Sequence, residues 1–387
     1  MLLGTSSPAI PDAWKGKRVR RTFPAVRDLE TSMRAPDELR SLLRIQVPLL
    51  GAPMAGGPST PALAAEVSRA GGLGFLGCAY STPEQILEWS REVRARTDRP
   101  FGINLFADVP EAPAGDPGPM LELLRPIHAD LGLPPPELPG PSSRSLDAQI
   151  DAVAQSGATA FSITFGLPSP AQMERLRRAG LVRIGTANTV EEARRLEAAG
   201  FEAVVAQGSE AGGHRGTFVG PFERGLVGTM ALVPQVVDAV RTPVVAAGGI
   251  MDGRGWVAAE ALGAAGVQLG TAFLASDESG AAPAYKDAVL AATDDGTAVT
   301  RAFSGRPARG LVNRFLKAVE EEPSSILPYP VQNALTRSMR TAAARAGRAE
   351  LLSLWAGQAA RLARRGPAAE IVRWLVEDAA QVRASLR

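Results

Sequence analysis

Short apolar runs alternate with amphipathic stretches of about ten residues along most of this chain of 387 residues. The apolar runs have the length and composition of buried parallel strands. The stretches between them open with helix-capping residues, as at Thr60-Pro61 and Thr82-Pro83. The pattern predicts eight strand-then-helix units, with strands at residues 47–54, 73–78, 101–106, 158–164, 181–187, 201–206, 242–250 and 264–274.

Eight consecutive units predict an α/β fold, a (β/α)₈ TIM-type barrel over residues 39–280. The competing fold is an open doubly wound sheet, which would favour a GxGxxG turn after the first strand. The chain has AGGPST at that place, which lacks the pattern. The barrel is therefore the preferred fold.

Two segments lie outside the repeat. Residues 1–38 are expected to form an N-terminal arm, which carries the basic cluster WKGKRVRR. Residues 281–387 are expected to form a mostly helical cap that packs on the barrel. Its LPYP turn is expected to lie over the barrel mouth as a lid. The helices expected in this segment are at residues 307–321, 331–346, 350–364 and 367–385.

A Pro- and Gly-rich stretch at residues 107–143 interrupts the rhythm after the third strand. Long loops in a compact domain are usually functional or mobile. One helix is expected in it near residues 120–131, and His128 is expected on the solvated face of that helix.

Composition mainly excludes classes of function. The formal net charge is +2, so no strong field points to nucleic acid. The single cysteine, Cys78, allows no internal disulfide and is expected in the core. No apolar run reaches the roughly 20 residues that span a bilayer, and the N-terminus lacks the apolar core of a signal peptide. A cytoplasmic enzyme, either a monomer or a small homo-oligomer, is expected.

Polar and glycine-rich sequences follow several predicted strands, at the face where barrel enzymes keep their active sites. The loops after the seventh and eighth strands are expected to bind a phosphate through backbone N–H groups. The alternative is that these are ordinary tight turns. The loop at Phe165 and the strand end at Thr186 are expected at the same rim. The other residues that converge are Ala52, Pro53, Met54, Asn104, Gln207, Gly212, Gly213, His214, Gly248, Gly249, Gln268, Leu269, Gly270 and Thr271.

The loop QGSEAGGHRG, residues 207–216, carries the clearest chemistry. A histidine ordinarily titrates near neutral pH, so His214 is expected to be suited to moving a proton. The neutral amides of Asn104 and Gln207 suit the donor–acceptor edge of a flavin ring, although they could bond only to loop backbone. No metal-ligand cluster and no Ser-His-Asp arrangement is evident, so a cofactor must supply the electronic step.

The chain resembles the class I nitronate monooxygenases, also called 2-nitropropane dioxygenases. The resemblance covers about residues 38–385, and its motifs are specific as an ordered set. The motifs are APMAGGPSTPALAAEVSRAGGLG, RPFGINLF, FSITFGLP, QGSEAGGHRGTF, PVVAAGGIMDGRG, GVQLGTAFL, FSGRPARGLVNRF and LPYPVQNALT.

The resemblance implies an FMN-containing barrel without metal that oxidises alkyl nitronates, such as propionate 3-nitronate, with dioxygen. The products would be carbonyl compounds and nitrite or nitrate, as in detoxification. His214 would be the catalytic base for neutral nitroalkanes, and Ala52–Met54 would line the flavin. Arg215 would either favour the anionic substrate or face solvent. The resemblance assigns FMN binding to Asn104, Gln207, Gly212, Gly249 and Gln268–Thr271.

Two other functions remain open. A flavin-dependent enoyl-acyl carrier protein reductase shares the GGH loop and the AAGGI segment, but it needs a nicotinamide site. A non-catalytic flavin-binding module would bind FMN without turnover.

Overall fold

The computed structural model describes residues 29–108, 115–138, 140 and 144–386. Eight parallel strands form a sheet in the order β1-β9-β8-β6-β5-β4-β3-β2. The sheet closes where Gly51 N donates to Leu73 O at 2.9 Å. The barrel prediction is confirmed, and closure excludes the open sheet. The strands are β1 (Leu49–Gly51), β2 (Gly74–Gly77), β3 (Phe101–Phe106), β4 (Ala160–Thr164), β5 (Val182–Ala187), β6 (Ala203–Gln207), β8 (Val244–Ala247) and β9 (Gly266–Leu269).

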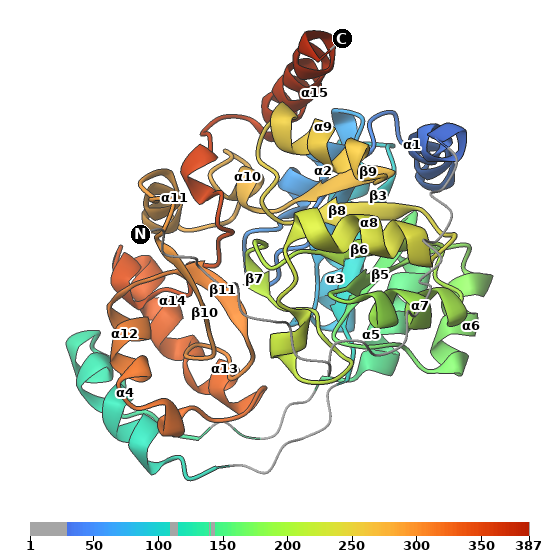
Figure 1. The fold of residues 1–387 in the computed structure, drawn as a ribbon. Coiled ribbons are helices and arrows are strands. Elements are labelled where there is room, and N and C mark those ends of the chain that lie inside the picture. Colours follow the sequence, from blue (N-terminus) through green and yellow to red (C-terminus); the bar gives the residue numbers. More distant parts are fainter. Residues whose placement is uncertain (1–28, 109–114, 139, 141–143, 387) are drawn as a thin grey trace, which may run out of the picture.

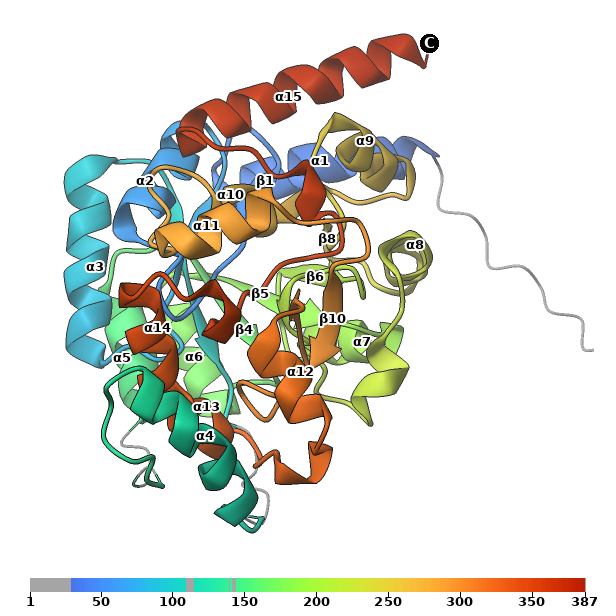
Figure 2. The same cartoon turned by 90° about the vertical axis from the view of Figure 1, so that its left-hand side faces the viewer.

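Helices surround this barrel and cover its strands (Figure 2). The expected caps are present: Thr60 accepts from Leu63 N, and Thr82 forms a capping box with Gln85. Alternating strands and helices place both faces of each strand in apolar surroundings, as the continuous apolar runs require. The helices are α2 (Pro61–Arg69), α3 (Pro83–Arg96), α5 (Leu146–Gln155), α6 (Pro170–Arg178), α7 (Val190–Ala198), α8 (Thr229–Ala239), α9 (Gly253–Ala261) and α10 (Thr271–Leu274).

The first and last helices complete the barrel's packing. Helix α1 (Leu29–Leu43) buries Leu39 and Leu43 in the cluster that fills the barrel interior, so ordered structure begins before residue 38. The expected basic cluster lies outside the described residues. Helix α15 (Ala368–Ser385) packs on α9 (Figure 1), where Gly253 N donates to the Asp378 carboxylate at 2.6 Å.

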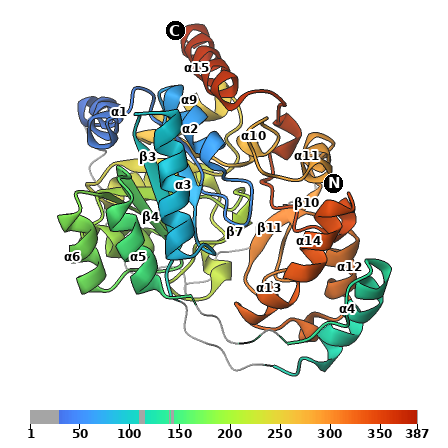
Figure 3. The same ribbon diagram turned by 180° about the vertical axis from the view of Figure 1, so that it is seen from behind.

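The interruption after β3 forms an excursion that leaves the barrel. Its helix α4 (Gly118–Asp130) lies beside the C-terminal segment in every view (Figures 1 and 3). Met120 and Leu124 are buried there in one cluster with Leu327 and Met339. The excursion therefore joins the two parts of the molecule.

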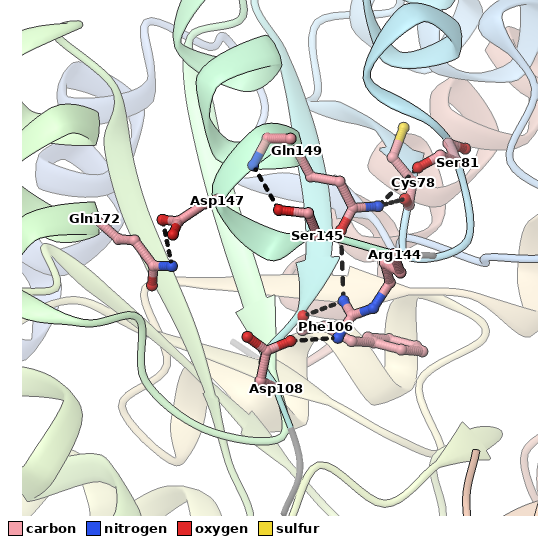
Figure 4. A network of polar contacts seen from close by, with 10 residues as sticks. Cys78, Ser81, Phe106, Asp108, Arg144, Ser145, Asp147, Gln149 and Gln172 are labelled. Carbon is pink, nitrogen blue, oxygen red and sulfur yellow. Dashed lines mark hydrogen bonds and ion pairs between the residues drawn. The ribbon is translucent and has the colours of Figure 1, made fainter. Parts of the chain in front are cut away.

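Arg144 fixes the base of this excursion (Figure 4). It donates to Phe106 O at 2.9 Å and pairs with Asp108 at 2.7 Å, which ties the outgoing and returning ends together. Beside it, Gln149 Nε2 donates to the carbonyls of Cys78 and Ser81. Cys78 is fully buried, as expected.

His128 does not lie on a solvated face, and that expectation is wrong. The residue is 4% exposed, and its Nδ1 is 2.6 Å from Pro134 O. Its Nε2 is 3.4 Å from the hydroxyl of Ser338 in the C-terminal segment. Helix periodicity alone could not show that this face of α4 would be covered.

The C-terminal segment is less helical than expected. The first residues of the expected helix 307–321 form strand β11, because they pair with β10 and with β7 (Gly213–His214). The expected helix 350–364 is wrong: it is extended chain between two short 3₁₀ turns. The elements are α11 (Pro283–Leu290), β10 (Thr297–Thr300), β11 (Ala308–Leu311), α12 (Arg314–Glu320), α13 (Val331–Leu335) and α14 (Arg337–Arg345).

Candidate active site

A cavity of about 210 Å³ lies at the carboxyl ends of the strands. One water needs only about 10–15 Å³ by the same kind of measure, so the cavity has room for an organic ligand. Thr186, one of the strand ends expected at the rim, lines this cavity, whereas Phe165 from the loop after the fourth strand does not. The other residues named for the rim all line it. These residues are Ala52, Pro53, Met54, Asn104, Gln207, Gly212, Gly213, His214, Gly248, Gly249, Gln268, Leu269, Gly270 and Thr271. We call them the barrel wall.

The opposite side of the cavity comes from the C-terminal segment. We call it the C-terminal wall, and sequence reasoning missed it. The FSGRPAR and LPYP motifs marked this segment without indicating which side chains face the cavity. Its lining residues are Tyr285, Asn333, Arg340, Ser353, Trp355, Gly357 and Ala359.

Arg215 holds the His214 loop in shape. It is 1% exposed and donates to the carbonyls of Gly208 at 2.6 Å, and of Gln207 and Gly225 at 2.9 Å each. The expectation that it faces solvent is therefore wrong. It does not line the cavity either, and its effect on an anionic substrate stays a prediction. The loop is instead built around this buried guanidinium, since its carbonyls need donors when they are removed from water.

The two neutral amides are partly committed to the protein. Gln207 Oε1 accepts from Asn188 Nδ2 at 2.8 Å and from Gly216 N at 3.0 Å, and its Nε2 donates to His214 O at 3.1 Å. Asn104 Nδ2 donates to Ser162 Oγ at 2.8 Å. By the capacity of an amide, Gln207 keeps one N–H and Asn104 keeps its oxygen for a ligand.

At the end of the seventh barrel strand, two positions have a backbone conformation that favours glycine. Gly248 has φ 113° and Gly249 has φ 73°, conformations that side chains disfavour. At the seam between the walls, a Cβ on Gly212 would lie 2.6 Å from Gly357 N. Gly357 N in turn donates to Thr271 Oγ1 at 3.0 Å. The two walls therefore meet backbone to backbone beside the predicted phosphate loops.

His214 stands in an aromatic enclosure between the walls. Its ring centroid lies 5.6 Å from those of Phe165 and Trp355, 6.0 Å from Phe106 and 6.3 Å from Tyr329. Tyr329 belongs to the LPYP turn, so this turn lies over the barrel mouth as expected. The imidazole Nε2 is 2.9 Å from the hydroxyl of Ser304.

The electrostatics keep this imidazole neutral. Burial, followed by the charges of Arg306 and Arg340, lowers the pKa of His214 to about 3. Aromatic side chains surround the ring, so water does little to stabilise its charged form. At neutral pH His214 is therefore neutral, and one of its ring nitrogens carries a lone pair.

Among the described residues that line the cavity, Arg340 carries the only formal charge. No carboxylate is among these lining residues. Its Nη2 donates to the carbonyl and side-chain oxygens of Asn333 at 2.7 and 3.0 Å, and its Nε donates to Thr336 O at 3.3 Å. No described carboxylate lies within 4 Å, and burial lowers its pKa to about 10. A partly buried cation without a counter-ion favours an anionic ligand.

Other features bound the possible chemistry. Among the described residues, no group of three His, Cys, Asp or Glu side chains could hold a metal ion. In the same part of the chain, no helix has the length and hydropathy needed to cross a membrane.

Fold and cavity together define a (β/α)₈ barrel enzyme with a rim site closed by a C-terminal segment. The family model described as "Nitronate monooxygenase" matches residues 37–378, and the chain belongs to this family. It is an oxidoreductase of a family that acts on nitronates.

Known relatives agree over nearly the whole chain. A "Probable nitronate monooxygenase" of Staphylococcus aureus (strain MSSA476) is 42% identical over 348 residues, which cover 89% of this chain and 98% of that protein. A crystal structure of nitroalkane oxidase from Streptomyces ansochromogenes is 43% identical with a TM-score of 0.84, covering 90% of this chain and 100% of that one. FabK from Thermotoga maritima is 32% identical with a TM-score of 0.72, covering 90% and 97%.

Proposed function

We propose that this protein is an FMN-dependent monooxygenase that oxidises alkyl nitronates, such as propionate 3-nitronate, with dioxygen. The products are carbonyl compounds, with release of nitrite or nitrate. The observation that carries the proposal is the cavity itself, where a neutral imidazole and an arginine without a counter-ion face one space that holds no carboxylate. A nitronate is an anion, so this charge balance favours it over a neutral ligand.

The residues of the barrel wall fit FMN. The spare N–H of Gln207 and the spare oxygen of Asn104 match the donor–acceptor edge of its ring system. Gly248 and Gly249 hold positive φ and line the cavity with backbone, and the Thr271 hydroxyl keeps its proton for an anion. Bound there, FMN would supply the electron-accepting chemistry that the side chains lack.

The protein's own groups bind the substrate and handle its proton. Arg340 and Arg306 provide the positive potential that draws a nitronate into the cavity. For a neutral nitroalkane, the neutral His214 takes the proton from carbon. The aromatic enclosure of Phe106, Phe165 and Trp355 keeps water from the reacting carbon.

The test is anaerobic mixing of the yellow protein, first with a nitronate and then, in a fresh sample, with NADPH. We expect the nitronate alone to bleach the flavin absorbance rapidly. Bleaching by NADPH alone would favour an enoyl-acyl carrier protein reductase, and bleaching by neither would favour a binding module. A colourless protein that takes up no FMN would contradict the proposal.

A further inference from the structure

The FSGRPAR motif, residues 303–309, leads into the strand that pairs with His214. Ala308 pairs with His214 and Arg309 with Gly213 in an antiparallel ladder. On the other side of His214, Arg215 N donates to Pro307 O at 2.9 Å. Ser304 lies in the same segment and is 1% exposed. The histidine and this serine are therefore held at a fixed separation by backbone on both sides.

The hydrogen bonds of Ser304 determine which nitrogen of His214 carries the proton. The Ser304 hydroxyl donates to Arg306 O at 3.0 Å and accepts from Arg306 N at 3.3 Å. A hydroxyl has one proton, and a carbonyl oxygen can only accept. With that proton committed to Arg306 O, the contact of 2.9 Å between His214 Nε2 and Ser304 Oγ needs Nε2 as the donor. The network thus assigns the Nε2–H tautomer.

The other ring nitrogen faces the cavity. Nδ1 of His214 makes no hydrogen bond to any residue in the described ranges. It is also not one of the fully buried polar atoms without a partner in those ranges, so it is accessible. It therefore opens onto the cavity that His214 lines. The charged and titratable groups around the ring are Arg306, Arg340 and Tyr329, and none of them is an anion that would favour the imidazolium.

We propose that Ser304 is a positioning residue that fixes His214 as the Nε2–H tautomer, so that Nδ1 takes the proton from the carbon of a neutral nitroalkane. In this step the C–H bond breaks, its electron pair moves into the nitro group to give the nitronate, and the proton forms an N–H bond at Nδ1. The Nε2–H donates to Ser304 throughout. This inference rests on the proposed function of the site.

The tautomer can be observed directly, because the chain has only two histidines. Long-range ¹H–¹⁵N correlation spectra of the cofactor-loaded protein, labelled at histidine, are assigned with His214→Asn. We expect His214 to show a protonated Nε2 and an unprotonated Nδ1, and Ser304→Ala to lose this preference while Ser304→Thr keeps it. A protonated Nδ1 in the wild-type protein would overturn the inference.

Kinetics test whether the tautomer is used. In Ser304→Ala we expect turnover of a neutral nitroalkane to fall by between about tenfold and the ~10⁴-fold that a wrong tautomer costs in a Ser-His-Asp triad. Turnover of the preformed nitronate should change less than about twofold, because that substrate has no proton to remove. Ser304→Thr should restore most of the lost rate. Ser90→Ala is the matched control, since Ser90 is also 1% exposed and bonds a carbonyl in helix α3.

The outcomes separate this inference from the proposed function. A wild-type protein that oxidises no nitronate refutes the function, while the tautomer is still decided by the spectra. A variant that loses FMN, or loses nitronate and nitroalkane turnover equally, shows that Ser304 is merely structural and overturns the inference. A wild-type enzyme that oxidises nitronates but no neutral nitroalkane overturns the role of Nδ1.

Discussion

The two walls of the cavity are built from different chemistry. The barrel wall offers backbone, glycines and neutral amides, and its one titratable side chain is His214. The C-terminal wall offers large or charged side chains, above all Trp355 and Arg340. A barrel rim suits a cofactor that is recognised through backbone N–H groups. Selection of a charged substrate needs a desolvated cation, which the rim lacks and the C-terminal segment supplies. The predictions below test this division of labour.

The largest effect is expected on the barrel wall, at His214. His214→Asn should retain FMN but lose neutral nitroalkane turnover by about 10²- to 10⁴-fold, the usual contribution of a general base. Steady-state rates with a nitroalkane and its nitronate, together with the flavin spectrum, measure this. His128→Gln is the control, because His128 is the other histidine of the chain and lies in α4, outside the cavity lining. Unchanged nitroalkane turnover in His214→Asn would refute the role of the imidazole.

The seam between the walls is the next target. Gly212→Val places a Cβ 2.6 Å from the backbone of Ala356 and Gly357, so the C-terminal wall must shift away from the barrel. Such overpacking costs about 1–3 kcal/mol. We expect FMN to dissociate about five- to 150-fold more readily, as measured by fluorescence titration. Gly115→Ala should bind FMN normally, since its Cβ meets only Leu327 at 3.8 Å. Equal FMN affinity in both variants would mean that the C-terminal wall does not support cofactor binding.

On the C-terminal wall, Arg340→Met should weaken nitronate binding without removing FMN. A charged hydrogen bond contributes about 1.5–3 kcal/mol, so KM should rise about ten- to 150-fold while kcat changes less. Stopped-flow flavin reduction at varied nitronate concentration separates the two constants. Arg345→Met on the same helix is exposed and serves as control. A loss of flavin instead of a rise in KM would place Arg340 with the cofactor.

The last prediction concerns pH, which links the walls through the charges that act on His214. An unfolded histidine titrates near ~6.5, whereas burial and the charges of Arg306 and Arg340 lower the pKa of His214 to about 3 in the folded protein. Stability is therefore full above pH ~6.5 and falls as the pH drops towards 3, because only the unfolded state binds the proton. The slope reaches about 1.4 kcal/mol per pH unit. Urea unfolding at several pH values should show this term in the wild-type protein and not in His214→Asn. Identical slopes would contradict the lowered pKa.

Much of the barrel was predictable because its information is local. Each strand is an apolar run of the right length, and each helix begins with a cap such as Thr60 or Thr82. Parallel strands share one carboxyl edge, so the convergence of Asn104, Gln207 and His214 followed from topology alone. The C-terminal segment was harder. Residues 308–311 became a strand because β7 and β10 offered free edges, a long-range pairing that overrides helix propensity.

The fates of Arg215 and Arg340 show the same limit at single residues. Both are arginines in stretches that sequence alone marks as polar and exposed. Arg215 lies buried at the centre of the His214 loop, whereas Arg340 lines the cavity without a counter-ion. Local pattern cannot distinguish them, because burial depends on which distant segment covers the side chain.

By itself, then, the chain's order of apolar and polar residues determined the eight-unit barrel, the glycine-rich rim and the place of His214 on it, since all three follow from spacing along the backbone. Tertiary structure alone decided which tautomer that histidine holds, how far its basicity falls and which cation faces it. Those properties depend on Ser304, Arg306 and Arg340, which lie about 90 or more residues away in sequence and come within hydrogen-bonding or electrostatic range only when the C-terminal segment folds over the barrel.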